Sequence, residues 1–183
     1  MSLYQTEQRQ AKTTRILVYP NITFAKDLEK DSYIQVIKKQ ITLLNEIRDD
    51  LWFYLILPKE VPSLVFDNVT QLIVYLPTHS PTMRAHFDTE AIKKVLPREY
   101  DFDLVMCHLP EHAYDLKNVL YNKTQHVPKF FGYAHWFDFK EVVNWPMDSF
   151  NKSMIGLLEY DKCYINTQHQ NCLLYTYPST RDS

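Results

Sequence analysis

Residues 127–138, VPKFFGYAHWFD, decide the fold class more than any other part of the chain. The short apolar run at 130–134 follows Pro128, contains one of only two glycines in the sequence, and is typical of a buried strand. It ends abruptly in His135, with Asp138 three residues later. Because ligands of an open parallel sheet bind beyond the carboxyl ends of its strands, His135 is expected at such an end. The plainer interpretation is a loop histidine hydrogen-bonded to nearby backbone.

Similar apolar runs occur along the rest of the chain and alternate with segments of helical spacing. Strands are predicted at 15–19, 51–57, 72–76, 103–108, 130–134 and 162–167. Helices are predicted at 31–47, 88–95, 111–121 and 150–160, with Asp31 and Asp88 placed as caps. This alternation predicts an α/β fold, a Rossmann-like three-layer sandwich with a mostly parallel sheet of about six strands. The runs at 15–19, 103–108 and 130–134 are expected to be inner strands, because they leave no polar face for solvent.

Length and composition restrict the class of protein. A chain of 183 residues with 45% hydrophobic content predicts one domain, at 14–177, between a loose leader at 1–13 and a tail at 178–183. The net charge is -2 and no basic run occurs, so no nucleic-acid partner is expected. No apolar stretch approaches the roughly 20 residues that a membrane helix needs, and the start does not resemble a signal peptide. A cytoplasmic protein without a membrane span is therefore expected.

The low glycine content excludes two kinds of phosphate site. Dinucleotide and P-loop sites need several glycines, and neither GxGxxG nor GxxxxGK[ST] occurs in this sequence. No cofactor is therefore expected. His108, Glu111 and His112 form an HxxEH pattern, but Pro110 interrupts the helical spacing that a zinc site requires, so no metal is predicted.

Polar side chains follow the predicted strands where each strand ends. In parallel sheets with right-handed crossovers these ends share one edge, so the side chains are expected to meet there. Each could instead be an ordinary loop residue. The candidates for substrate binding are Asn21, Thr23, His108, Glu111, Asp138, Asn166 and Thr167, and the candidate catalytic residue is His135.

The order of these segments resembles the amino-terminal half of a GT-B glycosyltransferase, particularly of the family 4-like type. The resemblance rests on four short motifs, at 15–27, 103–108, 128–138 and 161–167, and covers about residues 14–175. It implies an enzyme of two Rossmann-like domains, in which the first binds a sugar or glycan acceptor and the second a nucleotide-sugar donor. It also implies that His135 lies near the transferred sugar. The glycine-rich loop usual after the first strand is replaced here by Asn21-Ile22-Thr23-Phe24-Ala25.

The donor-binding lysine and paired glutamates of that family have no counterpart in these 183 residues. The resemblance therefore implies a half that is incomplete without a donor-binding domain, either as a fragment or as a stand-alone remnant that needs a separate donor-binding chain. The expected protein partner is such a chain or a second copy in a homodimer. The alternative from another class is a non-enzymatic small-molecule or partner-binding module on a flavodoxin-like sheet. A hydrolase that uses His108 and Glu111 ranks below both, since no serine or cysteine stands in a nucleophile elbow.

Overall fold

The chain folds around a six-stranded, all-parallel sheet with the strand order β3-β2-β1-β4-β5-β6. The computed structural model describes residues 13–22, 27–74, 87–97, 101–121, 127–134 and 147–165. The strands are β1 (Thr14–Tyr19), β2 (Leu51–Leu57), β3 (Val69–Ile73), β4 (Leu104–Cys107), β5 (Lys129–Ala134) and β6 (Lys162–Ile165). The helices are α1 (Ser32–Ile47), α2 (Thr89–Val95), α3 (Pro110–Tyr121) and α5 (Met147–Leu158), with 3-10 turns η1 (Leu28–Lys30) and η2 (Pro62–Leu64).

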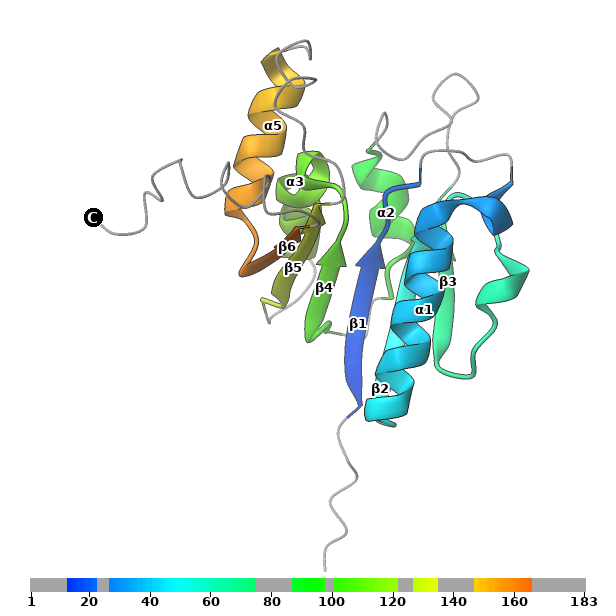
Figure 1. Cartoon of the computed structure of the whole chain (residues 1–183). Helices are drawn as coiled ribbons and strands as arrows, with labels where there is room; N and C mark the ends of the chain where they lie inside the picture. The colour runs from blue at the N-terminus through cyan, green and yellow to red at the C-terminus, as the bar shows by residue number, and fades with distance from the viewer. Residues whose placement is uncertain are drawn as a thin grey trace, which may run out of the picture.

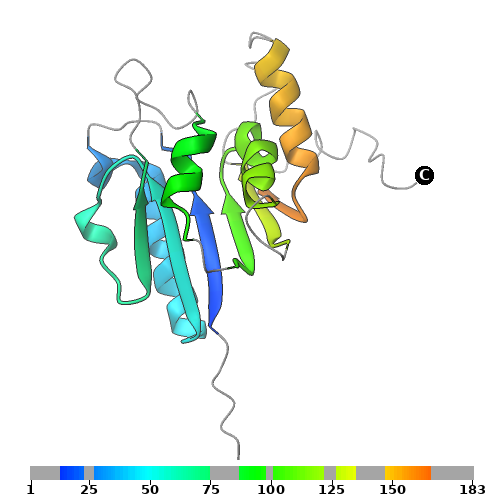
Figure 2. The same cartoon turned by 180° about the vertical axis from the view of Figure 1, so that it is seen from behind.

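Helices lie on both faces of the sheet and make three layers. Helix α1 lies in front of β1 and β2 in Figure 1, whereas α2 and α3 lie in front of the sheet in the opposite view of Figure 2. The α/β class, the parallel sheet and the layered architecture predicted from the sequence are thereby confirmed. The strands run upward in Figure 1, so their carboxyl ends form the upper edge of the sheet.

The three strands predicted to be internal are internal: β1 pairs with β2 and β4, β4 pairs also with β5, and β5 pairs also with β6, all in parallel. Side chains of these strands on one face of the sheet are less buried than predicted. Leu17 and Val105 are fully buried, but Leu104, Met106 and Phe131 are only half-buried. A continuous apolar run therefore identified each inner strand correctly. It did not predict whether the described residues cover both faces of that strand.

Close packing on the α3 face depends on both glycines. Helix α5 approaches α3 so closely that a Cβ on Gly156 would overlap the backbone carbonyl oxygen of Pro110. On β5, a Cβ on Gly132 would overlap the ring of Tyr160, whose hydroxyl donates a hydrogen bond to the Cys107 carbonyl at 3.0 Å. Both glycines are thus required by tight contact between elements and not by unusual backbone angles.

Helix caps were predicted well, but two element boundaries were wrong. Asp31 and Asp88 cap α1 and α2 through their carboxylates, as expected. Strand β3 lies three residues earlier than predicted, because Thr70 and Gln71 of this edge strand bond with Trp52 and with the Val61 backbone. Helix α5 begins and ends earlier than predicted. Tyr160 therefore lies beyond the helix, and its hydroxyl donates to the Cys107 carbonyl of β4.

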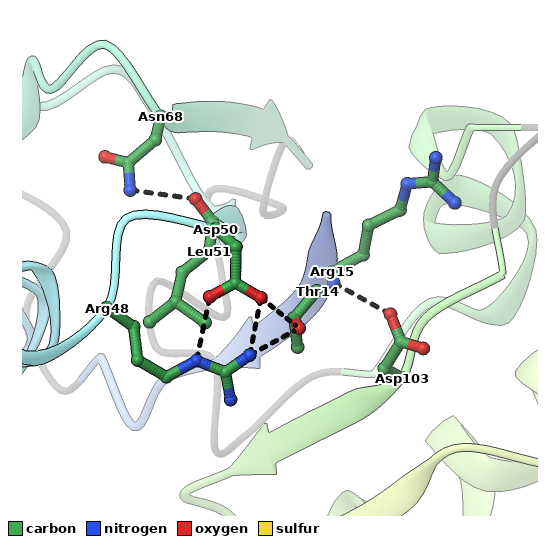
Figure 3. Close-up of polar contacts among 7 residues, drawn as sticks. All are labelled: Thr14, Arg15, Arg48, Asp50, Leu51, Asn68 and Asp103. Atoms are coloured by element: carbon green, nitrogen blue, oxygen red, sulfur yellow. Dashed lines mark hydrogen bonds and ion pairs between the residues drawn. The ribbon is translucent and has the colours of Figure 1, made fainter. Parts of the chain in front are cut away.

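The amino-terminal edge of the sheet is held by side chains that bond with one another and with backbone (Figure 3). Asp50 receives hydrogen bonds from Arg48 Nε at 2.8 Å and Thr14 Oγ1 at 3.1 Å, and the Arg48 bond lowers the pKa of the Asp50 carboxyl. Asn68 Nδ2 donates to the Leu51 carbonyl at 3.0 Å. This edge is therefore closed by structural contacts.

Two aspartates at this edge tie neighbouring strands together. Asp103 Oδ2 accepts a hydrogen bond from the Arg15 amide at 2.9 Å, as Figure 3 shows, and Asp161 Oδ2 accepts one from the Phe130 amide at 2.8 Å. Each aspartate lies just before the start of its own strand. Its carboxylate accepts the hydrogen bond that a backbone carbonyl would accept within the sheet. The aspartates of two of the four motifs noted above therefore have a structural role.

Asp103→Ala is expected to lower the free energy of unfolding by about 1.5–3 kcal/mol, the usual contribution of a hydrogen bond to a charged group. The loss should be smaller in Asp103→Asn, because the amide oxygen can still accept from the Arg15 amide. Urea unfolding of both variants measures the difference, with Asp101→Ala at a neighbouring exposed position as the control. Equal losses in the Asn and Ala variants would show that the hydrogen bond contributes little.

Candidate functional site

The strand order reverses between β1 and β4. From β1 the chain moves through β2 to β3 on one side, and from β4 through β5 to β6 on the other. The connections therefore leave toward opposite faces, and open α/β sheets generally bind their ligands beyond the carboxyl ends of the two strands at such a reversal. The His108 amide donates to the Tyr19 carbonyl at 2.8 Å and fixes the two strand ends beside each other.

Asn21 lies beyond the end of β1 with its side chain 3% exposed. Its Nδ2 donates a hydrogen bond to Tyr33 Oη of α1 at 3.0 Å. Within the part of the chain that the structure describes, its Oδ1 accepts no hydrogen bond. Leaving a buried acceptor without a hydrogen-bond donor costs about 1–3 kcal/mol of stability. A ligand that donates a hydrogen bond to Asn21 Oδ1 would therefore be favoured.

His108 follows β4 and is also buried, with 2% of its surface exposed. Its ring lies between two tyrosine rings, with centroids 6.1 Å from Tyr33 and 5.6 Å from Tyr133. Asn21, Tyr33, His108 and Tyr133 thus form a connected group, called here the rim cluster, which joins the ends of β1, β4 and β5 to the first turn of α1.

Glu111 and His112 stand in the first turn of α3, on the opposite side of the strand end. Glu111 is half-buried, and its carboxylate favours the positive end of the helix dipole. The buried His112 ring shares a hydrogen bond with Tyr19 through Nδ1, at 3.1 Å from the phenol oxygen. Among the described residues, no three His, Cys, Asp or Glu side chains are placed to hold a metal ion.

Three buried groups under this edge, two phenols and a thiol, stay neutral near pH 7. Burial raises the pKa of the Tyr19 and Tyr160 phenols well above their ordinary value. Burial also raises the pKa of the Cys107 thiol to about 12. Since thiolate is the nucleophilic form of cysteine, Cys107 is suited to packing and not to covalent catalysis.

An apolar hollow of about 420 Å³ opens on the α1 side of the sheet below His108. It lies between α1 and strands β4, β5 and β6, and its walls are mostly hydrocarbon and aromatic. The principal lining residues are Leu43, Met106, His108, Phe131, Tyr133 and Tyr164. We refer to it as the α1-face hollow.

Three of the residues predicted for the site lie among the described residues. Asn21 and His108 lie in the rim cluster, and Glu111 lies on α3 beside the end of β4. The other predicted residues lie outside the described residues, and their roles stay predictions: Thr23, His135, Asp138, Asn166 and Thr167.

Sequence reasoning missed Tyr33 and Tyr133 as members of this group. Tyr33 falls within the helix predicted at 31–47 and Tyr133 within the strand predicted at 130–134, and neither is among the predicted site residues. A signal was present for each: Tyr33 follows the cap Asp31 by two residues, and Tyr133 is the penultimate residue of the strand predicted at 130–134. A side chain so close to the end of a parallel strand is expected near the groups at the carboxyl edge.

No protein-family model matches the sequence, and comparisons with curated proteins and with solved structures find no match. A search of the described residues finds no helix that is both long enough and apolar enough to cross a membrane.

Proposed function

We propose that this chain is the amino-terminal, acceptor-binding half of a GT-B glycosyltransferase of the family 4-like type. In this proposal a sugar or glycan acceptor binds at the carboxyl ends of β1, β4 and β5. A nucleotide-sugar donor binds only when a second domain or partner chain closes the site. The chain alone is then expected to bind an acceptor without transferring sugar.

The observation that carries the proposal is the placement of Asn21 and His108 at the reversal of strand order. All six strands are parallel, so the groups that follow β1 and β4 share one edge. The opposite edge is occupied by structural contacts of Asp50, Asn68 and Asp103. The two edges therefore differ in chemistry, and the carboxyl edge is the one suited to a ligand.

The chemistry of the rim cluster suits a ligand that carries hydroxyl groups. Asn21 Oδ1 is an acceptor, and a hydroxyl hydrogen can satisfy it. The half-buried Tyr133 ring offers an apolar face of the kind that covers the C–H face of a sugar ring, and tyrosine combines such a face with a polar tip. His135, from the resemblance, would meet charge that develops on the donor as the glycosidic bond breaks.

Sugar binding by the isolated chain tests this proposal. Saturation-transfer NMR with a panel of mono- and oligosaccharides is expected to detect at least one binder. Asn21→Leu should weaken its binding about 10-fold or more, because a lost hydrogen bond and an unpaired ligand hydroxyl together cost about 1–3 kcal/mol. Thr42→Ala, at an exposed position on α1 away from the rim cluster, is the control.

The same panel should include uridine, guanosine and adenosine diphosphate sugars. We expect neither hydrolysis nor transfer from these donors by the chain alone. Turnover of a nucleotide-sugar by the isolated chain would mean that no second half is required. Binding of none of the sugars would argue against the acceptor role.

The α1-face hollow favours a second candidate function, a non-enzymatic binding module. Its volume of about 420 Å³ falls within the range of about 300–1,000 Å³ typical of small-molecule sites, and its walls are apolar. A module of this kind would prefer an apolar ligand to a sugar. A Met106→Lys variant separates the two functions, since it should block the hollow and leave sugar binding at the carboxyl edge unchanged.

A further inference from the structure

One half of the α1 side of the sheet lacks a helix among the described residues. Helix α1 lies in front of β1 and β2, whereas β4, β5 and β6 carry α3 and α5 only on the other side (Figures 1 and 2). The side chains that these strands present toward α1 include Leu104, Met106, Phe131 and Tyr164. Strands of a parallel sheet are normally covered on both faces, so among the described residues this half of the sheet lacks part of a layer.

The surface that these side chains form over β4, β5 and β6 is apolar and continuous with the α1-face hollow. Tyr164 is 55% exposed and Leu43, on the adjoining side of α1, is 47% exposed. The rings of Phe131 and Tyr164 stack edge to face across β5 and β6, with centroids 6.3 Å apart. Contiguous apolar patches of this kind usually mark a site of interaction.

We propose that residues 172–177 of this same chain, CLLYTY, dock on this surface and complete the third layer. They form an apolar run in which only Thr176 is polar, and no Lys, Arg, Asp or Glu occurs between residues 166 and 180. The other terminal segment suits the surface less well. Residues 1–12 include Glu7, Arg9 and Lys12, and they join β1 at the amino edge of the sheet.

The position of the run in the chain brings it within reach. Strand β6 ends at Ile165, beside the surface, and the six residues 166–171 span at most about 20 Å when extended. Neighbouring strands lie about 4.8 Å apart, so β4 is about 10 Å from β6. Every part of the surface is therefore accessible to the run.

The short connection also favours this occupant over a second copy. A segment held by a short linker has an effective concentration in the mM range, well above that of a separate protein molecule in dilute solution. The proposal does not depend on the glycosyltransferase function, because it concerns packing on a face of the sheet and not the carboxyl edge.

Photo-crosslinking in the full chain tests the docking. Tyr175 is replaced by p-benzoylphenylalanine, which on irradiation inserts into nearby C–H bonds and favours methionine. We expect a crosslink within one chain, mapped by mass spectrometry to Met106 or to Leu43, Phe131 or Tyr133. Tyr164→Asp, at an exposed position, should reduce its yield several-fold. The same probe at Ser183, beyond the apolar run, is the control and should give little of this product.

Crosslinks between two chains would show that a second copy occupies the surface and would overturn the proposal. Crosslinks to other parts of the chain, or none, would also overturn it. A second measurement uses dye binding. Leu173→Asp with Leu174→Asp should raise the fluorescence of anilinonaphthalene sulfonate several-fold at unchanged far-ultraviolet circular dichroism, whereas Ser179→Asp should not. Unchanged dye fluorescence in the double variant would contradict docking.

Discussion

Gly156→Ala is expected to lower the free energy of unfolding by about 2 kcal/mol, because added volume in a tight contact costs about 1–3 kcal/mol or more and helix propensity returns only about 1. The added methyl group would overlap the Pro110 carbonyl oxygen, which is backbone and cannot turn away as a side chain could. Helix α5 would have to move off α3, at a cost near the upper end of that range. About 2 kcal/mol corresponds to a roughly 30-fold change in the folding equilibrium.

Urea unfolding followed by circular dichroism measures this effect, with Ile155→Ala as the control. Ile155 neighbours Gly156 in the same helix and is 47% exposed, so its truncation should cost little. Without the contact, alanine would instead stabilise the helix by about 1 kcal/mol. A rise in the unfolding midpoint of Gly156→Ala would therefore contradict the packing of α5 on α3.

On the proposed function, His135→Ala is expected to reduce sugar transfer by a factor on the order of 10²–10³ once a donor-binding half completes the enzyme, the loss seen when one charge-stabilising donor is removed. The same substitution should leave stability within about 1 kcal/mol of the wild type, as for a side chain that is not packed in the core. Transfer rates and urea unfolding of the two proteins measure both quantities.

The two measurements separate a binding role from a packing role for His135. A buried, hydrogen-bonded histidine would leave its partner unsatisfied when removed, at a cost of about 1–3 kcal/mol. A large fall in the midpoint at unchanged slope would therefore assign His135 to the core. The carboxyl edge would then lack its expected catalytic group.

Secondary structure, the parallel sense of the sheet and the identity of three inner strands could be predicted from the sequence because their signals are local, whereas the full strand order was not predicted. Apolar runs and helical spacing alternate, and Asp31 and Asp88 stand where caps are needed. Parallel pairing follows from the crossover helices. The edge strand β3 was harder, because its pairing includes Thr70 and Gln71, whose polar side chains bond with neighbouring segments and not with the core.

The contacts of the candidate site were predicted less well, because they join residues far apart in the chain. Asn21 and His108 were expected at the carboxyl edge from their positions after strands, but their link through Tyr33 depends on the rotation and placement of α1. The burial of His108 could not be predicted either, because a histidine at the end of a strand is exposed in some proteins and enclosed in others. The absence of a covering helix on the α1 side of β4, β5 and β6, among the described residues, could not be predicted from the apolar sequences of these strands.

Amide chemical-shift mapping of the 15N-labelled chain, titrated with a sugar that binds, tests the proposed function most directly. We expect the shifts to concentrate at Asn21 and Tyr33, the members of the rim cluster that do not line the α1-face hollow, and to leave Asn68 and Asp103 at the amino edge unchanged. Shifts confined to Leu43 and Tyr164 around the α1-face hollow, or no saturable shifts with any sugar, would contradict an acceptor-binding site at the carboxyl ends of β1 and β4.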